Sequence, residues 1–146
     1  MDILHRIGVE GSSPETVYEK LTTIDGLAGW WTEDTSGDPG VGGVIEFRFP
    51  PGLIDMSVVE LAPGRRVVWA PTTEPGEWIG TTVTWDLRQD GDFTIVLFEH
   101  AGWAAPSEFM HHCSTKWATF LMSLKALCES GEGAPSPRDL TISDWH

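Results

Sequence analysis

Histidine and acidic side chains that could act in acid–base chemistry lie at the ends of two apolar segments. Glu99 and His100 end the segment FTIVLFEH, and Asp55 begins the segment DMSVVEL. Adjacent residues of a strand face opposite sides, so Glu99 and His100 cannot both enter one cavity. A histidine or a carboxylate that is desolvated in an apolar cavity can act as a general base. If the protein is an enzyme, we therefore expect His100 to be its base, with Asp55 as the second candidate.

Metal chemistry and nucleophilic catalysis have less support in the sequence. No spacing of His or Cys resembles a zinc finger or a His-Glu-x-x-His motif, so we predict no metal site and no cofactor. No serine stands between glycines as a nucleophile elbow requires. Cys113 and Cys128 lie about 22 Å apart along one predicted helix, which is too far for a disulfide. Both fall on its apolar side, and we expect buried free thiols.

The element that must position these side chains is a long helix over residues 107–128. Apolar residues such as Phe109, Cys113 and Phe120 recur there with a period near 3.6, which predicts one broad apolar face. Pro106 and Ser107 are typical of a helix start, and Gly131 is typical of a stop. At ~1.5 Å per residue this helix is about 33 Å long, and its apolar face needs a partner surface.

The preceding residues predict that partner surface as an antiparallel sheet. Apolar and polar residues alternate in several short segments, and turn residues such as Asp-Gly separate them. The predicted order is one strand, two short helices, about five strands and the long helix, which is an α+β fold. The expected strands are 2–10, 44–49, 55–61, 65–70, 80–88 and 93–100, the short helices follow Ser13 and span 23–29, and 32–43 is a loop.

Residues 134–146 are predicted as a tail or arm outside the domain formed by residues 1–133. The segment begins with the linker-like residues APSP and then carries Leu140, Ile142 and Trp145. This is much apolar surface for a free end. The tail is therefore expected to dock as an edge strand or arm, and disorder is the alternative.

Six short segments, in order, resemble the small single-domain relatives of the activators of the 90-kDa heat-shock chaperone ATPase, within the START-like or SRPBCC superfamily. The resemblance covers about residues 7–133 and implies a helix-grip fold, in which a curved antiparallel sheet of about six strands wraps around a long C-terminal helix. It also implies a cavity between sheet and helix. Lys116 departs from the pattern, because these relatives often have glycine there. We expect its stem to pack while its amine reaches water, and the alternative is a charge at the cavity mouth. The segments are SPETVYEKLT, GWW, VGGVIEF, VVELAPGRRVVW, DFTIVLFEHAGW and KWATFLMSLKALCESGEG.

The aromatic content supports such a cavity. Eight tryptophans and six phenylalanines exceed the needs of an ordinary core in a chain of this length, and large rigid rings pack imperfectly where strands curve. Register or place in the family pattern puts eleven residues between sheet and helix as expected ligand contacts. These are Trp31, Phe47, Phe49, Trp69, Trp85, Phe98, Trp103, Phe109, Met110, Cys113 and Trp117.

The net charge of the chain indicates which classes of binding partner are disfavoured. The 146 residues include 9 Lys and Arg against 22 Asp and Glu, which gives a net charge of -13 at pH 7. A negative field repels phosphate backbones and anionic headgroups, so we expect neither nucleic acid nor a membrane as partner. No apolar run approaches the ~18 residues of a membrane span, and the N-terminal segment lacks a secretory-signal pattern. We expect a cytoplasmic protein.

These observations leave three functions open. The first is binding of a small hydrophobic or aromatic molecule in the cavity, without any need for catalysis. The second is an enzyme of the polyketide-cyclase type, which the resemblance suggests and which would use His100 or Asp55. The third is a chaperone-interaction module, as in the ATPase activators. A homodimer is also open, because the segment FTIVLF of the strand 93–100 is apolar on both faces and the tail carries apolar residues.

Overall fold

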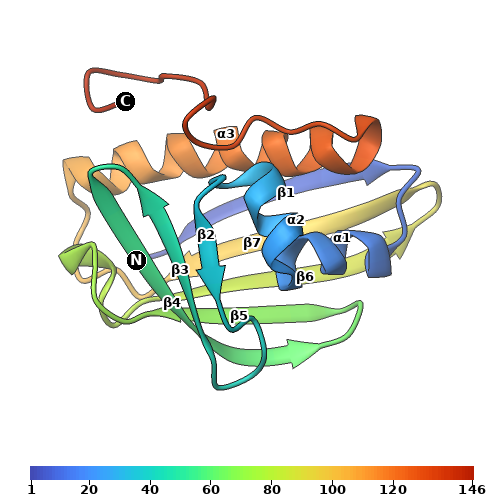
Figure 1. Cartoon of the computed structure of the whole chain (residues 1–146), viewed down its shortest axis with the longest axis horizontal. Coiled ribbons are helices and arrows are strands. Elements are labelled where there is room, and N and C mark those ends of the chain that lie inside the picture. The colour runs from blue at the N-terminus through green and yellow to red at the C-terminus, as the bar shows by residue number, and fades with distance from the viewer.

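The computed structural model describes residues 1–146, and the long helix α3 (Glu108–Ser130) runs along one side of the molecule (Figure 1). The Ser107 hydroxyl caps its first turn by accepting a hydrogen bond from the Met110 N–H at 3.1 Å. Gly131 ends the helix with a left-handed φ of 87° and donates its N–H to the Leu127 carbonyl. The predicted start and stop are therefore confirmed. No helix of the chain is long and apolar enough to cross a membrane.

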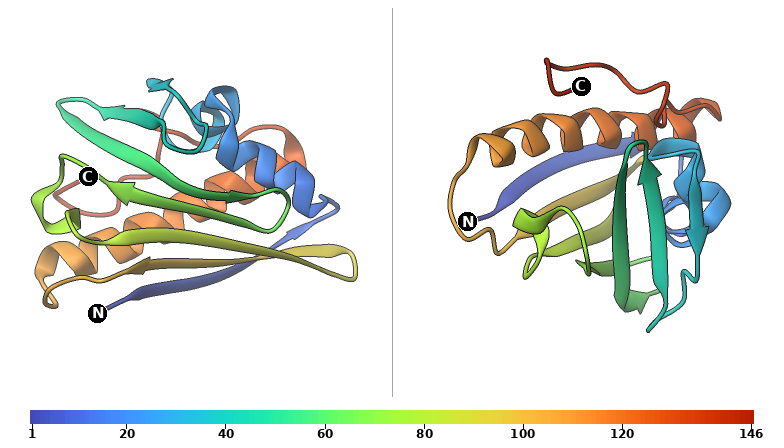
Figure 2. Two further views of the ribbon diagram at one scale, coloured as in Figure 1. Left: turned by 90° about the horizontal axis from the view of Figure 1, so that it is seen from below. Right: turned by 60° about the vertical axis from the view of Figure 1, so that its left-hand side comes forward.

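One antiparallel sheet of seven strands curves around this helix, in the order β1-β7-β6-β5-β4-β3-β2 (Figures 1 and 2). The predicted α+β helix-grip fold is confirmed. Its strands are β1 (Ile3–Glu10), β2 (Thr35–Gly37), β3 (Val44–Phe49), β4 (Gly52–Ala62), β5 (Arg66–Pro71), β6 (Thr82–Asp90) and β7 (Phe93–Ala101), with a short 3₁₀ helix η1 (Gly76–Trp78) between β5 and β6.

The extra strand β2 lies in the segment that was predicted as a loop. It pairs with β3 over three residues, and its last residue, Gly37, has a φ of 112°. An added Cβ at Gly37 would lie 2.3 Å from the Val44 carbonyl oxygen, so only glycine fits this pairing. The three residues Thr35, Ser36 and Gly37 include no apolar side chain and so show no alternating pattern. For this reason the strand was not predicted from the sequence.

Two short helices, α1 (Pro14–Thr22) and α2 (Ile24–Trp30), follow β1 as predicted. Ser13 caps α1, and Thr23 is both the last cap of α1 and the first cap of α2, where its hydroxyl accepts from the Gly26 N–H at 3.0 Å. The two helices lie beside the C-terminal part of α3 (Figure 1). Apolar side chains of the concave sheet face, the short helices and α3 form a single core.

The tail docks as an arm along α3 and not as an edge strand (Figure 1). Its attachment begins where the Ala134 N–H donates to the Ser123 hydroxyl at 2.7 Å. Ser136 then donates its N–H to the Trp31 carbonyl at 2.8 Å and accepts from the Glu33 N–H at 3.0 Å. These bonds join the tail to the segment between α2 and β2.

Candidate functional site

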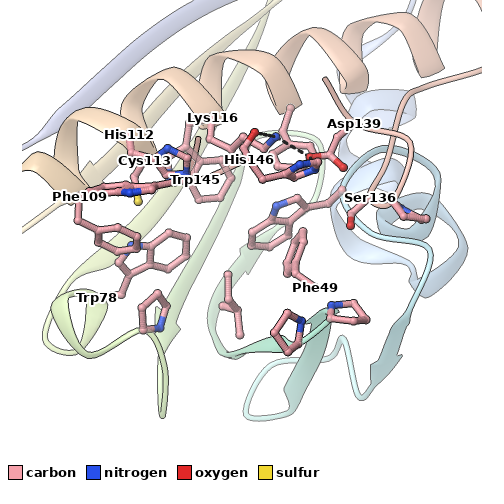
Figure 3. A pocket seen from close by; sticks show the side chains of 18 residues that line it. Phe49, Trp78, Phe109, His112, Cys113, Lys116, Ser136, Asp139, Trp145 and His146 are labelled. Atoms are coloured by element: carbon pink, nitrogen blue, oxygen red, sulfur yellow. Dashed lines mark hydrogen bonds and ion pairs between the residues drawn. The ribbon is translucent and has the colours of Figure 1, made fainter. Parts of the chain in front are cut away.

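An apolar cavity of about 550 Å³ lies between the first half of α3, the β3–β4 hairpin, the η1 segment and the tail (Figure 3). Its walls come from five parts of the chain that are separated in sequence. They are Trp31 of α2's end, Phe49, Pro50, Pro51 and Ile54 of the hairpin, Pro75 and Trp78 near η1, Phe109, His112, Cys113, Lys116, Trp117 and Phe120 of α3, and Ser136, Pro137, Asp139, Trp145 and His146 of the tail.

Aromatic rings form most of the inner wall. Trp117 lies with its ring centroid 5.1 Å from that of Trp31 and 5.7 Å from that of Trp78. Phe49 meets Trp31 at 5.5 Å and Phe120 at 6.1 Å, both edge to face. These separations are typical of favourable aromatic pairs. The resulting surface suits flat or greasy molecules and offers few polar contacts.

Five of the eleven residues predicted as ligand contacts line this cavity: Trp31, Phe49, Phe109, Cys113 and Trp117. The other six do not line it. Phe47, Trp69, Trp85, Phe98 and Trp103 are at most 3% exposed and pack in the core, and Met110 is partly buried against it. Alternation along a strand tells which face a side chain takes, but not how deep along the sheet it lies.

Sequence reasoning missed Trp78 and Phe120, which both line the cavity. Phe120 was on the apolar face of the helix, so its spacing was available as a signal. Trp78 stood in a proline- and glycine-rich segment that was predicted as a loop, and nothing local indicates that this loop folds over the helix. The prolines of the cavity wall had no signal either.

His100 does not line the cavity but lies behind it, fully buried. The indole N–H of Trp117 donates to His100 Nδ1 at 3.1 Å, so Nδ1 is an acceptor. Nε2 therefore carries the proton and donates to the Thr81 hydroxyl at 2.9 Å, and that hydroxyl donates to the Trp78 carbonyl. Burial lowers the pKa of His100 to about 4. The imidazole is a neutral linker that orients Trp117, and both of its nitrogens are occupied.

Asp55 lies outside the cavity as well. Its strand neighbour Ile54 lines the cavity, so the Asp55 side chain takes the other face of β4. There it accepts a hydrogen bond from the Thr73 hydroxyl at 3.2 Å. The prediction that His100 or Asp55 enters the cavity as a base is therefore wrong in geometry for both residues.

The thiol of Cys113 faces the cavity but is not suited to nucleophilic attack. Burial raises the pKa of Cys113 to about 12 and that of Cys128 to about 11, so both stay protonated near neutral pH. Neither forms a disulfide, as their separation predicted. No group of three or more His, Cys, Asp or Glu side chains converges where it could hold a metal ion.

The polar part of the cavity is a cluster made by α3 and the tail (Figure 3). Lys116 Nζ lies 2.6 Å from Asp139 Oδ2 and also donates to the Leu140 carbonyl at 2.7 Å. Sequence reasoning expected a lysine whose amine reaches water, but the Lys116 side chain is only 15% exposed. Beside it, the rings of His112 and Trp145 meet edge to face at 5.6 Å. Burial, and then the charge of Lys116, lower the pKa of His112.

A curved antiparallel sheet that grips one long helix and leaves an apolar cavity between them defines the START-like, or SRPBCC, class of proteins. Residues 12–129 match the family described as Activator of Hsp90 ATPase homolog 1-like protein. The chain belongs to this family, and the resemblance seen in its sequence segments is confirmed. No curated protein matches the chain.

Solved structures repeat the fold. The solution structure of the Aha1 dimer from Colwellia psychrerythraea is 45% identical, with a TM-score of 0.84 over 91% of this chain and 99% of that one. CalU16 from Micromonospora echinospora is 24% identical, with a TM-score of 0.74 over 93% and 77%. Protein SSP2350 from Staphylococcus saprophyticus is 18% identical, with a TM-score of 0.76 over 91% and 95%. The last two likenesses show the fold alone.

Proposed function

We propose that this protein binds a small hydrophobic or aromatic molecule in the cavity between α3, the β3–β4 hairpin and the tail. The observation that carries the proposal is the cavity itself, about 550 Å³ in volume and lined by rings of α2, β3, η1, α3 and the tail. Binding sites for small molecules commonly measure about 300–1,000 Å³ and are mostly apolar with a few polar groups. A flat ligand can pack against several rings at once.

The proposal predicts measurable binding of 1-naphthol, a flat and neutral probe. We expect it to quench tryptophan fluorescence, because Trp31, Trp78 and Trp117 line the site, and to raise the thermal midpoint by mass action. Calorimetry should give a negative heat-capacity change, which marks burial of apolar surface. If 1-naphthol and a broad set of apolar compounds leave fluorescence and midpoint unchanged, the proposal is wrong.

A pair of variants on one strand locates the site. Phe49 lines the cavity at the end of β3, and Val44 is 42% exposed at the other end of that strand. Removing the Phe49 ring deletes its edge-to-face contacts and leaves part of the wall open. We expect Phe49→Ala to weaken 1-naphthol binding by about tenfold, the equivalent of ~1.4 kcal/mol, and Val44→Ala to leave it unchanged.

Acid–base catalysis by His100 or Asp55 has no comparable support. His100 is neutral and has both ring nitrogens occupied, and Asp55 lies on the opposite face of β4 from the cavity. A cyclase-type reaction that used either of these predicted residues would need it within reach of the bound substrate, and neither lines the cavity. For this reason the proposal is limited to binding.

We also propose that the chain forms a homodimer, because the 45% identical Colwellia protein was solved as a dimer. The outer face of β1 and β7 supports this proposal. Leu4 is 67% exposed and Leu97 is 39% exposed there, next to Arg6. A face that combines apolar and charged residues can pair with a second copy of itself.

Light scattering after size-exclusion chromatography tests the dimer. Leu97→Glu adds a charge to the proposed contact and should give a monomer. Met122→Glu changes a similarly exposed residue on α3, 52% exposed, and should keep the mass of the native protein. A monomeric native chain would contradict the proposal.

A further inference from the structure

Lys116 is the only lysine or arginine that lines the cavity, and it belongs to helix α3. The hydrogen-bond and ion-pair partners of its amine all belong to the tail, and the amine also lies 5.4 Å from the centroid of the Phe120 ring. It pairs with Asp139 at 2.6 Å and donates to the carbonyls of Leu140 at 2.7 Å and His146 at 3.2 Å. Without the tail, this amine would be a single positive charge at the edge of an aromatic cavity.

Asp139 is a buried carboxylate that the tail only partly satisfies. Its side chain is 2% exposed. Its Oδ2 lies 2.6 Å from Lys116 Nζ and 3.4 Å from His146 Nε2. Its Oδ1 is also buried and has no hydrogen-bond partner. A buried charged oxygen without a hydrogen-bond partner is unfavourable. The contact of Asp139 with Lys116 is therefore less favourable than that of a carboxylate with partners for both of its oxygens.

The part of the tail that carries Asp139 can leave without loss of the sheet or the core. Every hydrogen bond between backbone groups that involves residues 138–146 lies within the tail itself, for example Ile142 N–H to the His146 carbonyl. Apart from those of Lys116, its ion pairs with the body of the domain join the exposed side chain of Arg138 to the exposed side chains of Glu33 and Glu132. The family match also ends at residue 129, before the tail.

The tail also brings an aromatic ring to the cavity. Trp145 lines it and meets the ring of His112, while about half of the Trp145 side chain remains exposed. The tail thus presents a carboxylate to Lys116 and an indole close by. An aromatic molecule with one carboxylate offers the same two groups.

We infer that the cavity accepts an apolar or aromatic carboxylic acid, whose carboxylate takes the place of Asp139 on Lys116 as residues 138–146 move away. The exchange replaces one negative charge by another, so the charge around Lys116 is conserved. A free ligand can also approach with both carboxylate oxygens available for partners. This inference rests on the proposed binding function and names its ligand class.

The test compares 1-naphthaleneacetic acid with 1-naphthaleneacetamide, which has nearly the same shape but no charge, on the full chain by calorimetry. We expect the acid to bind at least about tenfold more tightly, as a charge-assisted contact to Lys116 requires. In Lys116→Met the acid should fall to the affinity of the amide. Lys125→Met changes a second lysine of α3, paired with Glu129 outside the cavity, and should keep the preference.

The displaced tail provides an independent measurement. In Asp139→Asn the competing charge is gone, so the acid should bind about threefold to tenfold more tightly than to the native chain. Hydrogen exchange at Ile142 and His146, which donate the bonds within the tail, should rise when the acid binds but not when the amide binds.

The outcomes separate the two ideas. Equal affinity for acid and amide, an unchanged acid affinity in Asp139→Asn, or a tail whose exchange does not respond to the acid would overturn the exchange and leave apolar binding intact. Failure of acid, amide and 1-naphthol alike would overturn both.

Discussion

Acidification should destabilise the protein through one buried histidine. Burial lowers the pKa of His100 from its ordinary 6.5 to about 4, because a charged ring there would lose water and meet the Trp117 N–H at 3.1 Å. Above pH 6.5 the ring is neutral in both the folded and the unfolded chain, so it adds no pH dependence. Below pH 6.5 the unfolded chain binds a proton at this position and the folded chain does not.

The free energy of unfolding should therefore fall by about 1.4 kcal/mol for each pH unit below 6.5, until the folded ring titrates near pH 4. Between pH 6.5 and pH 5 the loss from His100 is about 2 kcal/mol, which urea unfolding followed by tryptophan fluorescence can resolve. Carboxylates also begin to titrate in this range, so the native profile alone does not isolate the histidine.

His100→Gln isolates it, because the amide can still donate and accept hydrogen bonds but does not titrate. We expect the difference in stability between native protein and this variant to shrink by about 2 kcal/mol from pH 7 to pH 5. His111→Gln removes an exposed imidazole from the first turns of α3 and is the matched control. This control measures the effect of the same substitution outside the core. Parallel profiles for native protein and His100→Gln would refute the assignment of His100 as a neutral buried linker.

Three further experiments test the packing of the fold and the site. Gly37→Ala should destabilise the fold by about 1–3 kcal/mol in urea unfolding, because the new Cβ would meet the Val44 carbonyl oxygen at a residue with φ of 112°. Cys113, with a pKa raised to about 12, should resist iodoacetamide at pH 8 in the native state and react after unfolding, as mass spectrometry can show. Ser123→Ala removes a bond to the Trp30 carbonyl and one from the Ala134 N–H, so it should cost about 1–3 kcal/mol and speed hydrogen exchange at Ala134.

The sequence predicted the elements that have a strong local signal. The spacing of apolar residues and the caps Ser107 and Gly131 define α3 to within two residues, and alternation together with turn residues defines the strands from β3 to β7. Strand β2 lacks such a signal, because three residues ending in Gly37 pair only when β3 is already in place. Local pattern therefore predicts elements but misses pairings that depend on the rest of the fold.

The candidate site was predictable only in part, for a similar reason. The face of α3 that carries Phe109, Cys113 and Trp117 follows from periodicity, and these residues line the cavity. The partner of Lys116 does not follow from any local pattern, because Asp139 reaches it through a tail that folds back along the helix. The charge of Lys116 suggested that its amine would be solvated. In the folded chain the amine instead contacts the buried carboxylate of Asp139.

The position of the cavity follows from how the two halves of α3 are covered. Gly29 of α2 has no side chain, and an added Cβ there would lie 2.9 Å from Leu127, so α2 approaches the C-terminal half of α3 closely. Leu121 and Leu124 are at most 1% exposed there. Neither α1 nor α2 covers the N-terminal half, where the η1 segment and the tail border the cavity instead. Residues 138–146 form no hydrogen bond between backbone groups outside the tail, so they can move without loss of the core, which is the property that entry of a ligand requires.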